Sequence, residues 1–144
     1  AGIGGPFFDR LSCRLGAMAL ALPACKGVEF GSGFGAARAT GLQNNDTMRY
    51  DDGGRIVRPT NHAGGIEGGI SNGMPVVMRC VFKPPSSIGA PQATVNLETG
   101  REETLEVKGR HDPCIVPRAV PVVESAMALV LLDRLLDGAT PSAS

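Results

Sequence analysis

The sequence predicts an α+β domain in which antiparallel strands pack on long apolar helices. Two observations carry this prediction: helix-like apolar periodicity at both ends of the chain, and strand-like alternation between them, interrupted by Gly- and Pro-containing turns. A length of 144 residues fits one domain, and 42% apolar residues can form a core. We expect the domain over residues 1–138 and a flexible tail over residues 139–144.

The first helix is predicted over Phe7–Leu22, because apolar residues recur there at spacings of three and four, starting from Phe8. Pro6 suits the first helical position. Pro23 ends the helix, since the residue before a proline avoids the helical region. This apolar face is expected to lie in the core.

A closing helix is predicted over Pro121–Asp137, with Pro121 at its start and Gly138 just after its end. It is apolar on nearly every side, and a helix of this kind is buried on more than one side. We therefore expect a sheet against one face and a second sheet or a subunit against another.

Strand-like runs occupy the middle of the chain. Strands are predicted over Cys25–Phe30 and Met74–Phe82, and a hairpin is predicted from Ala93–Leu97 and Glu102–Lys108. In the second strand, one face is expected to carry Val76, Met78, Cys80 and Phe82. The side chains of the hairpin expected to point inward are Val95, Leu97, Leu105 and Val107.

The segment Gly31–Ala37 follows a predicted strand and matches the pattern G-x-G-x-x-A of dinucleotide-binding turns. Asp51 and Asp52 lie at the distance where that fingerprint places an acidic residue. We disfavour a nucleotide-binding domain, because Gly41 interrupts the required helix early and the two acids lie in a polar, Gly-rich segment. Titration with NAD tests this alternative.

Two further segments are predicted to be irregular. Gly41–Pro59 is polar and without periodicity, so we expect a mobile surface loop that could serve as a lid. Asn61–Gly73 contains five glycines in thirteen residues. Glycine lets a ligand approach the backbone closely, which favours a ligand-facing segment over a flexible linker.

Composition excludes several classes of function. The net formal charge is zero and aromatic residues are few, which gives no basis for binding nucleic acid. The longest apolar run, Ala126–Leu132, is too short to span a bilayer. Four scattered cysteines without C-x-x-C spacing, and only two histidines, predict no metal site. We expect these cysteines to be reduced and mostly buried in a cytoplasmic protein.

Two polar segments carry candidate chemistry. Lys108–Cys114 places a cation, an imidazole, a carboxylate and a thiol in a turn between a strand and a helix. Lys83–Ser87 places a cation and two hydroxyls on a loop stiffened by prolines, which suits an anion such as phosphate. Ordinary polar loops are the alternative for both segments.

These segments, taken together with others, resemble the chorismate synthase family over essentially the whole chain. The matching runs, in order, are Gly5–Leu11, Pro23–Phe34, Asn61–Gly73, Lys83–Ile88, Gly109–Cys114 and Arg118–Pro121. The resemblance implies a sandwich of two sheets around central helices, assembled as a homotetramer. It also implies conversion of 5-enolpyruvylshikimate 3-phosphate to chorismate by 1,4-elimination of phosphate, with reduced FMN as cofactor and no net redox change.

The resemblance assigns roles to individual positions. Asp112 is expected to be the catalytic carboxylate near the flavin, and Arg110 to hold flavin or substrate phosphate. Some members of the family reduce their own flavin in an NADP-linked step, whereas others use an external source. The remaining cofactor-binding residues implied are Pro23, Ala24, Gly68, Lys83, Pro84, Pro85, Ser86 and Ser87. At Pro23 and Pro85 the family commonly has Asn, Ser or Thr-like residues, and proline removes a backbone donor.

Parts of the family pattern do not occur in this sequence. The runs Gly-Glu-Ser-His-Gly, Arg-Pro-x-His-Ala-Asp and Gly-Gly-Gly-Arg-Ser-Ser are missing. They carry the two catalytic histidines and much of the phosphate clamp, and His62 and His111 are different histidines. The chain also opens on Ala1 rather than Met. We expect the C-terminal portion of such an enzyme, inactive alone, and the alternative is a non-catalytic assembly or FMN-binding module of the same fold.

Overall fold

The computed structural model of the chain describes residues 1–139, and its core lies around helix α1 (Leu11–Ala21). Leu11, Leu15 and Ala19 are completely buried on one face of this helix, as the periodicity predicts. The predicted start at Phe7 is wrong. Residues 7–9 form a separate 3-10 turn, η1 (Phe7–Asp9), because Arg10 follows it with an extended ψ of 136° and so interrupts the helical backbone before α1. Phe8, expected on the buried face, is 89% exposed.

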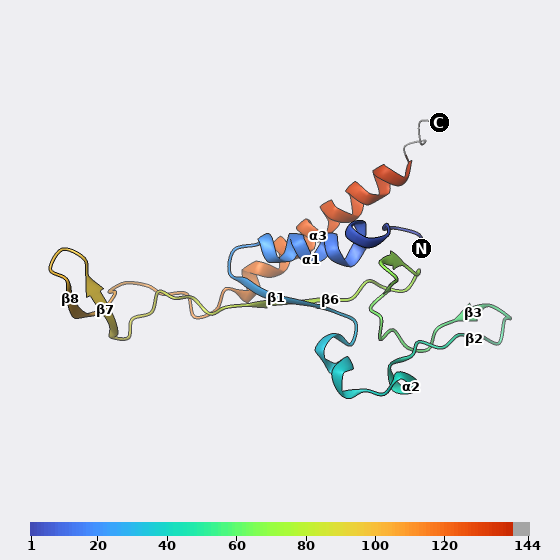
Figure 1. Ribbon diagram of the computed structural model, residues 1–144, viewed down its shortest axis with the longest axis horizontal. Helices are drawn as coiled ribbons and strands as arrows, with labels where there is room; N and C mark the ends of the chain where they lie inside the picture. The colour runs from blue at the N-terminus through green and yellow to red at the C-terminus, as the bar shows by residue number, and fades with distance from the viewer. Residues whose placement is uncertain (140–144) are drawn as a thin grey trace.

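Helix α1 packs on strand β1 (Cys25–Phe30), which pairs antiparallel with β6 (Met78–Phe82) (Figure 1). The prediction of β1 is confirmed. Strand β6 begins four residues later than predicted, because Val77 bonds to the backbone of Gly31 and Gly64 instead of joining the ladder. The opposite face of this strand pair is open, and Val81 is exposed there.

Helix α3 (Val116–Ala139) runs beside α1 and begins five residues before the predicted start (Figure 1). Pro117 occupies the first turn, where a missing backbone N–H costs little. Pro121 therefore lies inside the helix rather than at its start. Within residues 1–139 much of the apolar surface of α3 is exposed, with Leu129 at 67%, so the cover expected from a second sheet or a subunit stays a prediction.

The region between β1 and β6 contains more regular structure than predicted. It holds a 3-10 helix η2 (Gly33–Arg38), a short helix α2 (Gly41–Asn44) and a hairpin of β2 (Arg49–Tyr50) and β3 (Ile56–Val57). An irregular loop over Gly41–Pro59 is therefore incorrect. Asp51 accepts backbone bonds from Gly53 and Arg55, so it closes the hairpin turn. The antiparallel pairing of β1 also differs from the parallel unit of a dinucleotide-binding fold.

The carboxylate of Asp46 ties this region to the Gly-rich segment. It accepts hydrogen bonds from the backbone N–H groups of His62 and Ala63 and from the Thr60 hydroxyl. Burial alone would raise the pKa of Asp46, but the hydrogen bonds from Ala63, His62 and Thr60 together lower that pKa below its ordinary value.

The Gly-rich segment folds into a small hairpin of β4 (Ile66–Glu67) and β5 (Ile70–Ser71). Several of its glycines serve contacts within the chain. A Cβ at Gly64 would meet the backbone of Gly31, one at Gly65 would meet the carbonyl groups of Met74 and Pro75, and one at Gly69 would meet the side chain of Arg10. Gly68, at the hairpin turn, faces open space.

The hairpin of β7 (Gln92–Asn96) and β8 (Arg101–Leu105) extends away from the rest of the molecule (Figure 1). The pairing of two strands here is confirmed. The inward orientation of its apolar side chains is wrong, because Val95 and Leu105 are at least half exposed and Leu97 is 92% exposed. No other described element covers this hairpin.

The C-terminal end of the chain agrees only partly with the predicted boundary. Ala139, placed at the start of the tail, is the last residue of α3, and the rest of the predicted tail lies outside the described residues. Within residues 1–139, no helix is both long enough and apolar enough to cross a membrane.

Candidate functional site

The two polar segments singled out by their chemistry meet in the structure. We call Lys83–Ser87, which leaves β6, the site loop, and Gly109–Cys114, which leads into α3, the site turn. The Ser87 hydroxyl lies 3.2 Å from Nδ1 of His111, and Nε2 of His111 lies 2.9 Å from the carbonyl oxygen of Val107. One histidine ring therefore links the site loop to the site turn.

Pro23 and Ala24 join the same region through the backbone. They form the turn between α1 and β1, and the carbonyl of Ala24 accepts a 2.9 Å hydrogen bond from the N–H of Lys83. Ala24 has a φ of +67°, a left-handed conformation that is unusual for a residue other than glycine. This conformation directs its carbonyl toward the start of the site loop.

The charged side chains of the region differ in their pairing. Asp112 forms a 2.9 Å ion pair with Arg118, the two side chains being 42% and 76% exposed. Lys83 and Arg110 have no side-chain hydrogen bond or ion pair with any residue in 1–139. Two cations are therefore free to bind an anion, whereas the carboxylate is already held by an arginine.

The site loop and the site turn enclose an apolar cavity of about 170 Å³. Sites for small molecules in proteins usually have volumes of about 300 Å³ or more. The volume of this cavity is therefore about half of the usual minimum. Its lining residues are Phe82, Lys83, Pro84, Pro85, Pro113, Cys114, Ile115 and Val116. Ser86, also predicted to bind cofactor, lies exposed on the same loop.

Gly68 is not brought to this cavity by contacts within the described residues. Its hairpin is attached to the N-terminal segment, through a bridge between Gly4 and Ile70 and a bond from the N–H of Leu11 to the carbonyl of Gly69. Figure 1 places this hairpin near the N-terminus, whereas the site loop leaves the opposite end of β6. Gly68 was predicted to bind the cofactor together with residues of the site loop and the site turn, but in the structure it lies apart from them.

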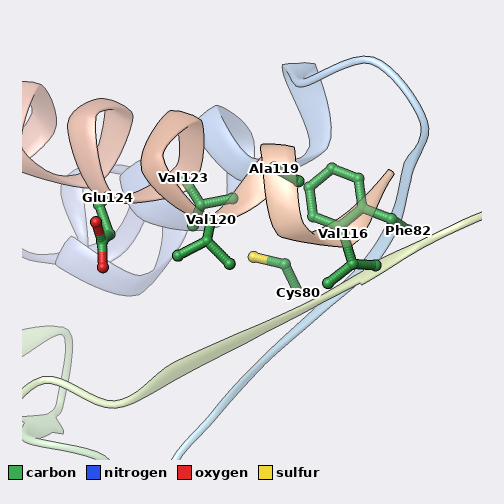
Figure 2. Close-up of a pocket in the computed structure, with 7 residues that line it drawn as sticks. All are labelled: Cys80, Phe82, Val116, Ala119, Val120, Val123 and Glu124. Carbon is green, nitrogen blue, oxygen red and sulfur yellow. The ribbon is translucent and has the colours of Figure 1, made fainter. Parts of the chain in front are cut away.

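A second apolar cavity of about 190 Å³ lies between β6 and the first turns of α3 (Figure 2). Figure 2 shows the sulfur of Cys80 pointing toward Val120, with Phe82 and Val116 beside them. Phe82 and Val116 also line the first cavity, so the two are neighbours. Sequence reasoning did not identify this cavity, although the alternation along the strand placed Cys80 and Phe82 on one face.

The cysteines are only partly as expected. All four are free thiols, but Cys13 and Cys114 are exposed, so the expectation that most are buried is wrong. Burial, followed by the proximity of Cys25, raises the pKa of the Cys80 thiol. Among the described residues, no group of three or more His, Cys, Asp or Glu side chains could hold a metal ion.

Comparison with known proteins places this geometry in context. The family model described as chorismate synthase matches residues 1–136. The chain is 55% identical to a chorismate synthase of Acaryochloris marina over 135 residues, and 54% identical to a chloroplastic chorismate synthase of Capnoides sempervirens over 136 residues. These matches cover 94% of this chain but 37% and 30% of the two relatives.

A solved structure titled as a crystal structure of chorismate synthase has the same arrangement. It matches with a TM-score of 0.72 and 33% identity over 95% of this chain and 34% of the other. The α+β fold predicted from the sequence is thereby confirmed. The chain spans about a third of the length of the relatives it matches. Because the family model matches nearly the whole chain, the chain belongs to the chorismate synthase family.

Proposed function

We propose that this chain is the C-terminal part of an enzyme that converts 5-enolpyruvylshikimate 3-phosphate to chorismate by 1,4-elimination of phosphate. The observation that carries the proposal is the family match over residues 1–136, across both the site loop and the site turn. The contact of Ser87 with His111 supports it, because it brings those two segments together in space.

The residues of the region fit a bound FMN in three respects. Lys83 and Arg110 are free to pair with a phosphate group. The apolar walls of the smaller cavity suit part of a flat ring system. Pro23 and Ala24 form an adjoining wall, joined to Lys83 by a backbone bond. When bound, reduced FMN supplies electron density to the substrate as phosphate leaves.

The side chains of the chain divide the remaining work. Lys83 and Arg110 hold the phosphate groups of flavin or substrate by charge-assisted hydrogen bonds. Ser86 and Ser87 contribute hydroxyl groups to the same anion. Asp112 takes or returns a proton beside the flavin, and its ion pair with Arg118 fixes the position of the carboxylate. Gly68 has room for a ligand to approach its backbone, and we place it on a part of the flavin site that this chain does not complete.

The site is incomplete within this chain. The smaller cavity is about half the usual size, and the runs bearing the two histidines and the phosphate clamp of the family do not occur in the sequence. We therefore propose that the chain alone binds reduced FMN weakly and does not form chorismate. The complete enzyme is proposed to be a homotetramer, in which other regions cover the exposed apolar side of α3.

Anaerobic titration with reduced FMN, followed by flavin absorbance with and without the enolpyruvyl substrate, tests the proposal. We expect weak, substrate-dependent binding that Arg110→Ala and Lys83→Ala each reduce by at least about tenfold, since a hydrogen bond to a charged group contributes about 1.5–3 kcal/mol. Arg101→Ala, on the outlying hairpin, is the matched control and should bind as the parent chain does. Equal binding by all of these chains, or chorismate formation by the chain alone, would contradict the proposal.

The second candidate is a non-catalytic assembly or FMN-binding module of the same fold. The exposed apolar surface of α3 and of the outlying hairpin favours it, because such surfaces are typical of protein interfaces. A pure assembly module would bind neither form of FMN, and a general FMN-binding module would bind oxidised and reduced FMN alike. Binding that is specific for reduced FMN and enhanced by substrate favours the enzyme part instead.

A further inference from the structure

His111 lies between two polar partners that do not have the same hydrogen-bonding capacity. The carbonyl oxygen of Val107 can only accept a hydrogen bond, so Nε2 of His111 must carry a proton. The Ser87 hydroxyl at Nδ1 can either donate or accept. The direction of the bond between Ser87 and His111 is therefore set by the protonation of the ring.

In the neutral ring, Nδ1 has no proton and accepts from the hydroxyl of Ser87, which then cannot donate elsewhere. In the protonated ring, Nδ1 donates to Ser87 Oγ, and the hydroxyl proton of Ser87 turns outward. We infer that His111 is a positioning residue whose protonation frees the Ser87 hydroxyl to donate to a bound phosphate oxygen. This role rests on the proposed FMN site, in which Ser87 binds an anion.

The surroundings of the His111 ring favour a link between its protonation and phosphate binding by Ser87. The edge of the ring lies against the chain after the site loop, since a Cβ at Gly89 would lie 3.6 Å from Cδ2 of His111. The charged and titratable groups on the segments that meet here are Lys83 on the loop, Glu106 beside Val107, and Lys108, Arg110, Asp112 and Cys114 around the turn, with Arg118 on α3. Asp112 is paired with Arg118, and no carboxylate in residues 1–139 bonds to the His111 ring, whose partners are Ser87 and Val107. A bound phosphate would supply a countercharge to the protonated ring.

The first arm of the test is the tautomer of His111, measured from ring nitrogen chemical shifts in a titration by NMR. The chain has only two histidines, so the signals are readily assigned with His111→Gln and His62→Gln variants. We expect the neutral His111 ring to be protonated at Nε2. A neutral ring protonated at Nδ1 would overturn the inference, and this result would not depend on flavin binding.

The second arm measures the affinity for reduced FMN from about pH 8 to about pH 5.5, across the range in which histidine side chains usually change charge. Relative to His111→Gln, the parent chain should gain about tenfold in affinity as the pH falls. Glutamine can still accept from Ser87 and donate to Val107, so His111→Gln should keep the affinity seen at high pH. Titration of the flavin itself affects every variant alike and cancels in the comparison.

Two further variants separate the switch from a simple effect of charge. Ser87→Ala leaves the ring able to become charged but removes the hydroxyl, so it should abolish most of the pH response. His62→Gln should leave the response intact. A response that survives in Ser87→Ala or in His111→Gln would overturn the inference while leaving the proposed function standing. If no variant binds reduced FMN at any pH, the proposed function fails and the inference fails with it.

Discussion

The two ends of β6 belong to regions that differ in how they are stabilised. One region adjoins the start of β6 at Met78. There β1 and the β4–β5 hairpin lie against α1, whose leucines are buried, and glycines allow close approach between backbone segments. We call this the packed half. Beyond Phe82, residues 83–115 form the outlying half, where the site loop, the β7–β8 hairpin and the site turn contain no buried residue (Figure 1).

The outlying half is the part of the chain that depends on the rest of the family fold. An isolated two-stranded hairpin is at best marginally stable in water, so the outlying half needs a covering surface that the described residues do not provide. Most of the residues proposed to bind flavin lie in this half. The residues that stabilise the fold therefore lie mainly in the packed half, whereas the residues that form the site lie mainly in the outlying half.

The largest expected effect concerns the core of the packed half. Leu15→Ala should lower the free energy of unfolding by about 2–5 kcal/mol, because it removes a completely buried side chain. Leu97→Ala, at the tip of the outlying hairpin, should change it by no more than about 0.5 kcal/mol. Denaturant unfolding of the two variants measures both values. Similar losses of unfolding free energy in both variants would mean that the hairpin is packed as tightly as the core, and the two halves would not differ as proposed.

A second pair of substitutions compares glycines with positive φ in the two halves. A Cβ at Gly31 would collide with the backbone of His62 and Gly64, whereas a Cβ at Gly100 would meet nothing. Gly100→Ala should cost only the strain of a left-handed residue, about 1–2 kcal/mol, and Gly31→Ala should cost more than that. Thermal unfolding ranks the two variants, and an equal loss of stability would refute the close approach at Gly31.

Asp46 gives an intermediate and pH-dependent effect within the packed half. Asp46→Asn should destabilise the chain by about 1–3 kcal/mol at neutral pH, since an amide cannot replace all three accepted bonds. The pKa of Asp46 is lowered in the folded chain, so its contribution is complete above the ordinary value of 3.8 and disappears as the pH falls through the folded value.

Unfolding measured at several pH values therefore should show the parent chain and Asp46→Asn converging in acid. If the difference in unfolding free energy between the two chains grew as the pH fell, the result would contradict a lowered pKa of Asp46 in the folded chain. Asp52→Asn is the control, because Asp52 has no side-chain hydrogen bond or ion pair with another residue in 1–139.

The smallest expected effect lies where the outlying half meets α3. Arg118→Ala breaks the exposed ion pair with Asp112 and should change the free energy of unfolding by less than about 1 kcal/mol. It should nevertheless alter the affinity for reduced FMN, because Asp112 loses the group that fixes its position. A large loss of stability with unchanged flavin affinity would show that the pair supports the fold instead.

The sequence predicted the local elements of the packed half well. Strand β1 and the buried face of α1 follow directly from the alternation of side chains and from the apolar spacing of Leu11 and Leu15. The start of α3 was missed because two prolines compete for the first turn, and Pro117 rather than Pro121 occupies it. The β2–β3 hairpin was missed because its strands are only two residues long.

The site was predictable in part. The side chains of the site loop indicated an anion and those of the site turn indicated binding or catalytic chemistry, and the structure brings the two segments together. The link through His111 could not be predicted, because it joins residues 24 positions apart through a single ring. The inward orientation of Val95 and Leu97 failed because alternation indicates which side chains share a face, but not whether anything covers that face.

Hydrogen exchange of the backbone amides, followed along the chain, measures the difference in local stability between the packed half and the outlying half. We predict that amides in the β1–β6 pair exchange only through global unfolding, whereas those in β7–β8 exchange far faster through local opening. Slow exchange of β7–β8, at the same rate as β1–β6, would contradict this prediction, because it would mean that the outlying half is held as firmly as the core.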